Sequence, residues 1–527
     1  MKRPALVIAV GSLFAVLALA DEGHHHEDLA AEQLGTVHFP ISCAASVQKP
    51  FARGVALLHS FWYEEAAKEF THIAKDDPSC AMAHWGVAMS LWHQLWDHPN
   101  AATIKRGLAE LKKAQSLHPG TDRERDYIAS LRMLYGKKGD HDQRAKAYSQ
   151  AMEGLYQHYP DDREAAAFYA LSLLASEPDG DTTFANRKKA AAVLEKLFKE
   201  EPTHPGVAHY LIHSYDKPQL AELGLPAARS YARIAPAAPH ALHMPSHIFA
   251  RLGLWQDDID SNLASIAATR KTAALHMGGA SHQLHAMDFL EYAYLQCGRE
   301  AAAKKLMEDL ETLHGVDEEH LGYSKIEFAQ RYALELHHWQ EAASLQIPAN
   351  AKPGMKGLVF WGRVIGEARG GEAVAARKDL EHLKAIQKSM TTDSQNYESD
   401  ALKGYIAGAE PWVLHAEHRD EEAVAMLHAR ADKKDKIGEQ EDMPSREMLA
   451  DLLLETKHAD QALVEYETDL KFNPNRFNAL YGAASAAEMT GMNEKATAYY
   501  AQLVKVCDGS NSDRPELGRA KALLAQK

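Results

Sequence analysis

The stretch that decides the fold is residues 54–78, GVALLHSFWYEEAAKEFTHIAKDDP. It places a small residue at Ala66, an aromatic residue four positions later at Phe70 and a proline eight positions after that at Pro78. Residues four apart share one face of a helix, and proline ends a helix. The stretch therefore predicts two helices that approach closely at Gly54 and Ala66, with the second ending before Pro78.

The same spacing recurs along the chain, which indicates an internal repeat. Further copies are Ala190/Leu194/Pro202, Ala227/Tyr231/Pro239 and Ala462/Tyr466/Pro474, with a looser copy at Gly107/Leu111/Pro119. The small and aromatic positions of the last full copy return once more as Ala496 and Tyr500. Alternating runs of β-branched residues are nearly absent, so we expect no strands.

This spacing resembles the tetratricopeptide repeat, a helix-turn-helix unit of about 34 residues. With its N-terminal leader, described below, the chain is similar to exported tetratricopeptide-repeat proteins of bacterial type. The resemblance implies an all-α solenoid of roughly ten or more helical hairpins stacked into a superhelix. It also implies that the first helix of each hairpin lines a concave face, where an extracytoplasmic protein or peptide would bind.

Breaks in the spacing divide the expected array. Around 137–147, 175–186 and 346–357, Gly, Asp and Pro indicate longer turns. We expect an irregular segment over 21–50, an array with a His-rich concave face over 51–345, divergent repeat-like helices over 346–440, a C-terminal repeat pair over 441–506 and a capping helix or tail over 507–527.

The N-terminus predicts export. Lys2 and Arg3 precede an apolar run that ends Ala-Leu-Ala at Ala20, which is typical of a cleaved signal peptide over 1–20. No later stretch approaches the roughly 20 apolar residues of a membrane span. We therefore expect a soluble mature chain in a periplasmic or secreted location.

Composition and charge exclude several classes. With 46% apolar residues the chain can fold, and its net charge of −15 argues against a nucleic-acid partner. No Gly-rich phosphate loop or haem-attachment motif is present, so we expect neither a nucleotide nor a haem. Of the four cysteines, we expect Cys43 and Cys80 to form a disulfide that ties the segment before the first repeat to the second; the alternative is buried free thiols.

Histidine is in excess, with 30 in the chain. Three groups recur at the starts of consecutive expected hairpins: His204, His209 and His213; His240, His243 and His247; and His282 and His285. His209 and His213 are four apart on a helix begun by Pro205, so they share a face. Neighbouring helices lie roughly 8–10 Å apart, close enough for imidazoles from two or three of them to meet at one ion.

We therefore predict a metal site for copper or zinc. Its expected ligands are His209, His213, His243, His247, His282 and His285, with Asp216 and Asp288 as carboxylates that orient imidazoles. Two points stay open. A helix begun at Pro245 would separate His243 from His247, and Met244, Met277 and Met287 favour copper unless they fill the core.

Other interpretations also stay open. The histidines could form a structural hydrogen-bonded ladder in a scaffold that binds protein or peptide, or line a pocket for an acidic or aromatic ligand. Catalysis is not expected, because His209-Tyr-Leu-Ile-His213 lacks the glutamate of a hydrolytic zinc helix, although an open metal position would permit it. The tract His24-His25-His26 is capable of weak chelation, and Trp92 and Trp96 could line a peptide groove.

Overall fold

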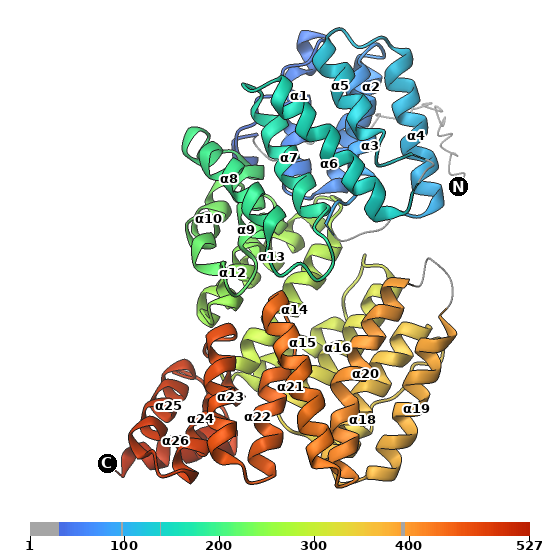
Figure 1. Cartoon of the computed structure of the whole chain (residues 1–527). Coiled ribbons are helices and arrows are strands. Elements are labelled where there is room, and N and C mark those ends of the chain that lie inside the picture. Colours follow the sequence, from blue (N-terminus) through green and yellow to red (C-terminus); the bar gives the residue numbers. More distant parts are fainter. Residues whose placement is uncertain (1–30, 96–98, 137–138, 391–395, 527) are drawn as a thin grey trace, which may run out of the picture. The chain divides into compact units, whose positions relative to one another are not determined.

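The computed structural model describes residues 31–95, 99–136, 139–390 and 396–526 (Figure 1). These residues form 26 α-helices, two short 3-10 helices (η2, Ala31–Leu34; η3, Ala45–Val47) and no strand. The predicted signal peptide, the His24–His26 tract and Trp96 lie outside the described residues.

The first fifteen helices run from α1 to the middle of the chain. Their bounds are α1 Gln48–His59, α2 Tyr63–Asp76, α3 Ala81–Ser90, α4 Ala101–Ser116, α5 Asp122–Leu131, α6 His141–His158, α7 Arg163–Ala175, α8 Ala185–Glu200, α9 Pro205–Tyr215, α10 Ala221–Ile234, α11 Pro239–His243, α12 Pro245–Arg251, α13 Trp255–Ala274, α14 Ala280–Gln296 and α15 Glu300–Leu310.

The remaining helices complete the array. They are α16 Glu318–Glu335, α17 Trp339–Ala343, α18 Pro353–Arg369, α19 Ala373–Ser389, α20 Asn396–Ala416, α21 Asp420–Ile437, α22 Ser445–Glu455, α23 Ala459–Phe472, α24 Phe477–Met489, α25 Asn493–Val506 and α26 Pro515–Ala525. The expected divergent region is thus occupied by two regular hairpins, α18–α19 and α20–α21, and the expected capping helix corresponds to α26.

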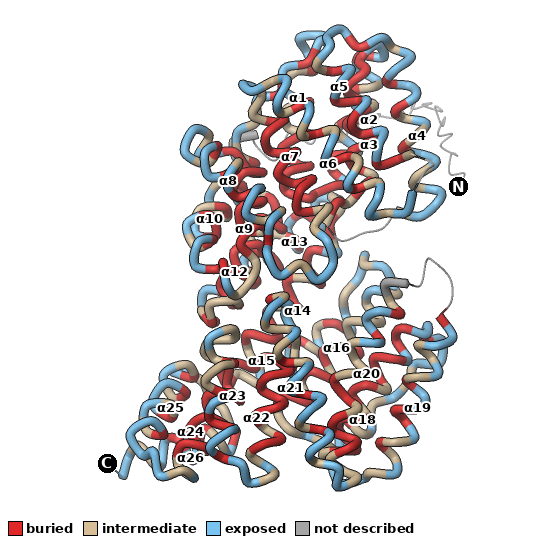
Figure 2. Tube along the Cα trace, in the orientation of Figure 1, coloured by how far each residue is buried: buried red, intermediate tan, exposed pale blue. Residues whose placement is uncertain are grey.

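Consecutive helices pack as antiparallel hairpins from α1–α2 to α24–α25, with α11 and α12 together serving as one first helix. The predicted fold class, an all-α array of tetratricopeptide-like hairpins, is confirmed. Helices α7 and α9 are buried on nearly every side, as the red tubes in Figure 2 show. A helix that is apolar all round belongs inside a layer of neighbours.

The repeat spacing has a direct steric reason. The Phe70 ring is fully buried between two glycines: a Cβ on Gly54 would lie 2.8 Å from it, and one on Gly86 would lie 2.4 Å from it. The pair Gly482 and Tyr466 repeats the arrangement near the C-terminus, with a Cβ 2.2 Å from the ring. Close-packed interiors leave no room for that methyl group, so the small position sets the approach of the helices.

A disulfide joins Cys43 to Cys80, with Cα atoms 5.0 Å apart, and Cys297 and Cys507 are buried free thiols. Trp92 is buried and packs edge-on against Tyr135, with ring centroids 5.4 Å apart, so its ring lies in the core rather than along a groove. No helix within the described ranges is long and apolar enough to cross a membrane.

Candidate metal centre

Members of all three histidine groups predicted from the sequence come together from α9, α11–α12 and α14. They form two sets of three imidazoles whose ligand atoms all lie within 4.8 Å of one another. We name them site 1 (His209, His213 and His240) and site 2 (His243, His247 and His285). Both sets combine rings from two consecutive hairpins.

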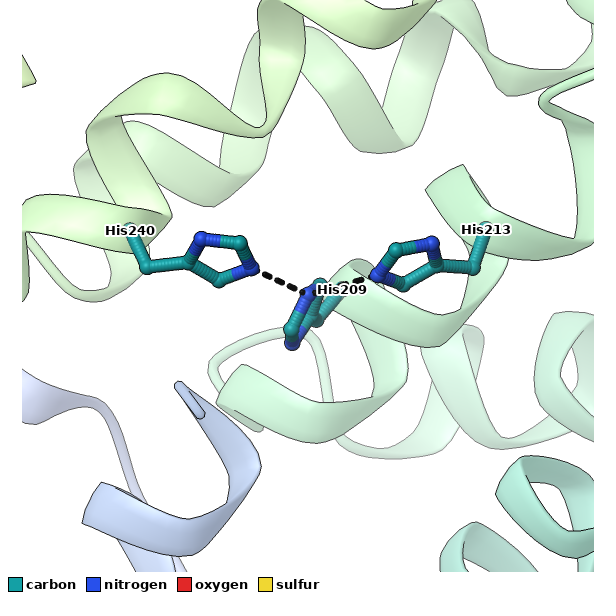
Figure 3. Close-up of side chains that lie close together, drawn as sticks. All are labelled: His209, His213 and His240. Carbon is teal, nitrogen blue, oxygen red and sulfur yellow. Dashed lines mark hydrogen bonds between the residues drawn. The ribbon is translucent and has the colours of Figure 1, made fainter. Parts of the chain in front are cut away.

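Site 1 is centred on His209. The His213 and His240 rings point at it from opposite sides in Figure 3, and their Nε2 atoms lie 3.1 and 3.2 Å from its own Nε2. The Nδ1 atom of His209 lies 2.6 Å from the backbone carbonyl oxygen of His59. A carbonyl only accepts, so Nδ1 carries the proton and Nε2 presents a lone pair to the other two rings.

In site 2 the Nδ1 atoms of His243 and His247 are also held by hydrogen bonds, but to side chains. The Nε2 atoms of His243 and His247 lie 3.1 Å apart. The Nδ1 atom of His243 donates to Asn262 Oδ1 at 2.6 Å, and that of His247 donates to Asp216 Oδ2 at 2.9 Å. Both protons are therefore on Nδ1, and the two Nε2 lone pairs face each other.

The orientation of the Asn262 amide is itself fixed. Its Nδ2 donates to the backbone oxygen of Asp258 at 3.0 Å and to Asp258 Oδ1 at 2.7 Å, which leaves Oδ1 toward the imidazole. Asp216 is held by Arg251, whose Nε lies 2.8 Å from Oδ1. Burial opposes ionisation of Asp216, but Arg251 and His247 outweigh it and hold the pKa of this carboxyl well below its usual range.

The junction between α11 and α12 at Pro245 keeps His243 and His247 on the same helical face. A new helix does begin at Pro245, but Met244 keeps helical angles, φ −51° and ψ −34°, and its N–H bonds His240 O at 2.9 Å. The chain therefore stays in helical register across the junction, and His243 and His247 remain one turn apart. Met244 and Met287 are fully buried in the core, consistent with packing rather than ligation.

The histidine pairs of the two sites are displaced by one repeat. His243 follows His209, and His247 follows His213, by the same interval in the sequence, which equals the length of one repeat. Each pair takes its third ring from the next hairpin, His240 for site 1 and His285 for site 2. The repeat thus places the two histidine pairs, whereas the third rings, His240 and His285, are not one repeat apart.

Each site also has one phenylalanine against all three rings. Phe61 lies 4.3, 5.7 and 5.6 Å, between ring centroids, from the members of site 1. Phe289 lies 4.9, 4.6 and 5.4 Å from those of site 2. Phe61 has φ 51°, a left-handed conformation that the same turn position also adopts in other hairpins, at His337, His418 and Lys457.

The turn that carries Phe61 also holds the chain before α14. Trp62 Nε1 donates to Gly278 O at 2.8 Å, and Gly278 N donates to Glu65 Oε1 at 2.6 Å. The first hairpin, which supplies no member of either site, therefore fixes the segment leading to His285 as well as the tautomer of His209.

The spacing and protonation suit a metal ion. Tetrahedral zinc with nitrogens at about 2.0–2.1 Å separates them by about 3.3 Å, close to the 3.1 and 3.2 Å between His209 and the other two rings of site 1. Burial lowers the pKa of His209 to about 3, and burial with His247 lowers that of His285 to about 4. These rings are neutral at physiological pH, which is the form that binds metals.

A third buried group, the Glu164 cluster (His59, Glu164 and His204), has its ligand atoms equally close but does not suit a metal. The two ring Nε2 atoms donate to the Glu164 carboxylate at 2.7 and 3.0 Å. Their Nδ1 atoms accept from Tyr210 OH at 2.9 Å and from Val207 N at 3.2 Å. Every nitrogen is therefore partnered within the protein.

Five of the six predicted ligands thus lie in sites 1 and 2, and their metal binding stays a prediction. The sixth, His282, lies beside site 1, with its ring centroid 5.2 Å from that of His240. The third member of site 1 is His240, which was not among the predicted ligands. Asp216 contacts an imidazole as expected, whereas Asp288 pairs with Arg331 at 2.7 Å. The sequence did not single out Asn262 or Phe61 as residues of the site.

No protein-family model and no curated protein matches the chain. Similar solved structures include a human IFIT1 dimer with m7Gppp-AAAA, 13% identical, covering 81% of this chain and 90% of that one at a TM-score of 0.36. Naa15/Naa10 bound to HypK-THB is 11% identical over 91% of each chain, with a TM-score of 0.24. The fold class therefore rests on the chain's own hairpins.

Proposed function

We propose that this protein is a metal-binding helical-repeat protein that holds copper or zinc at sites 1 and 2. One observation carries the proposal: the Nε2 atoms of His243 and His247 lie 3.1 Å apart while both Nδ1 atoms donate elsewhere. Two neutral rings in this arrangement repel each other unless a proton or a metal ion lies between the facing lone pairs. Neutral imidazole nitrogens are ligands that zinc and copper share.

The surroundings support this proposal. Asp216 and the carbonyl of His59 fix which nitrogen of each ring is free, as the hydrogen-bonded partners of metal-bound histidines usually do. The phenylalanine against each site supplies an apolar wall that limits water. His213, His247 and His285 are partly exposed, so an ion has a route in.

We also propose that the protein works outside the cytoplasm. The leader-like residues 1–20 favour export, and the Cys43–Cys80 disulfide is of the kind that persists in oxidising compartments. In that location the protein would hold metal, and an extracytoplasmic protein partner would bind the same scaffold. The sites offer three protein ligands each, which leaves room for a further ligand on each ion.

The test is elemental analysis of tag-free protein in which His24, His25 and His26 are replaced by alanine, which removes weak chelation by that tract. We expect copper or zinc to remain near stoichiometric after exhaustive dialysis. The triple variant His209→Ala, His213→Ala and His247→Ala should lose it while its far-ultraviolet circular dichroism stays helical.

A matched control removes three exposed histidines instead. His320, His382 and His428 have half or more of their side chains exposed, so His320→Ala, His382→Ala and His428→Ala should leave the metal content unchanged. Wild-type protein that is metal-free and takes up neither ion would sink the proposal. The histidines would then be structural, in a scaffold that binds protein.

A further inference from the structure

Sites 1 and 2 are neighbours, not separate patches. Three pairs of rings connect them: His240 and His243 lie 5.8 Å apart between centroids, His213 and His247 also 5.8 Å, and His240 and His285 6.4 Å. Two of these rings, His240 and His243, stand one turn apart on α11. An ion in either site would thus lie within a few ångströms of the ligands of the other.

The charge at this place is unbalanced if two divalent ions enter. All six ligands are imidazoles, and the charge of Asp216 is already offset by Arg251 at 2.8 Å. Four positive charges in a partly buried cluster are costly unless they are paired. A small anion between the ions would reduce this cost for both at once.

We propose that sites 1 and 2 form one dinuclear centre, in which two ions lie side by side and share a small anionic oxygen ligand such as hydroxide. This inference rests on the proposed function, since it needs both sites to bind metal. The bridging ligand reaches the centre past the partly exposed rings His213, His247 and His285. The phenylalanines Phe61 and Phe289 lie against one site each.

Electron paramagnetic resonance with Cu(II) as the probe tests this arrangement. Each isolated Cu(II) carries one unpaired electron, and two ions that share an oxygen bridge couple their spins. The full-length protein loaded with Cu(II) should bind two ions per chain, yet its integrated signal should fall well below two spins per chain.

Two single variants provide matched controls, each at a partly exposed ring of one site. His213→Ala breaks site 1 and His247→Ala breaks site 2. Each should bind one Cu(II) and show the full signal of one spin, because no second ion remains to couple with it. Circular dichroism and unfolding by urea check that both variants are folded.

The outcomes separate the two proposals. Two bound ions with the full intensity of two independent spins would leave metal binding intact and overturn the dinuclear centre. One ion per wild-type chain would overturn it as well. No binding of Cu(II) or of Zn(II) would overturn the proposed function itself.

Discussion

Two groups of buried histidines meet at α9 and differ in one respect. In the Glu164 cluster every ring nitrogen has a hydrogen-bond partner in the protein. In sites 1 and 2 the Nδ1 atoms of His209, His243 and His247 also have partners, but Nε2 atoms face other Nε2 atoms. Proximity of possible ligands is the same in both, so the direction of the lone pairs, as at His243 and His247, is what distinguishes the Glu164 cluster from the sites proposed for an ion.

The largest effect on stability should come from the Glu164 cluster, in which every ring nitrogen has a partner. Glu164→Ala leaves two buried N–H donors unpaired and should lower the free energy of unfolding by about 3–5 kcal/mol. Urea unfolding measures this, and the metal content of the folded fraction should not change. The exposed Glu381→Ala should cost less than about 0.5 kcal/mol. Equal losses of unfolding free energy in the two variants would show that the Glu164 cluster does not stabilise the fold.

The next effect concerns the stability that metal adds. An ion at about 100 times its dissociation constant stabilises the folded state by about 2.7 kcal/mol for each site. His247→Ala should remove the contribution of site 2 and leave that of site 1. Thermal unfolding with and without a chelator measures both. A metal-dependent stabilisation that survives unchanged in this variant would contradict the assignment of His247.

A smaller effect should follow from the residue that fixes the tautomer. Asp216→Asn keeps the shape but weakens the hold on His247 Nδ1, and changes of this kind usually lower metal affinity about 10–100-fold. Competition with a chromogenic chelator should show one weakened ion and one unchanged ion. Loss of both ions would mean that the sites do not bind independently enough to be told apart.

The smallest effect should come from one buried carboxyl group, Glu367, which lies outside both histidine groups. Burial, with Asp379 nearby, raises the pKa of Glu367 to about 7. This carboxyl therefore keeps its proton in the folded protein until the pH approaches 7. The folded state then binds more protons than the unfolded state between about pH 4.5 and 7. Its contribution to stability is full below about pH 4.5 and is lost as pH rises toward 7.

Glu367→Gln should remove that dependence. Relative to the variant, the wild type should lose up to about 1 kcal/mol across this range, a value reduced for solvent screening. Urea unfolding at several pH values measures the difference, and Glu381→Gln is the exposed control. Parallel pH profiles for wild type and Glu367→Gln would show that the carboxyl is already ionised in the folded protein.

The sequence predicts the helical-hairpin fold and the histidine pair of each site. The spacing of Gly54, Ala66 and Phe70 is a steric requirement, so it predicts the hairpin, and Pro205 predicts the shared face of His209 and His213. The offset of one repeat length between the two histidine pairs was also present in the sequence as a signal.

The third ring of each site could not be predicted in the same way. Whether His240 or His282 joins site 1 depends on how far each helix is rotated against its neighbour, which no local pattern fixes. The buried Glu164 gives no local signal either, because it is stabilised by contacts with residues on helices far away in the sequence.

Repeat arrays are usually quasi-one-dimensional, since each unit contacts only the next, and they can fold or fray from any point. The bonds from Trp62 and Glu65 to Gly278 break that rule, because they join the first hairpin to a segment beyond the sixth α-helical pair of the chain. Closing so long a loop slows folding and makes the enclosed hairpins lose structure together. Deleting α1 and α2 should therefore cost the far histidines their order, so the shortest functional fragment cannot be found by trimming repeats from the N-terminal end.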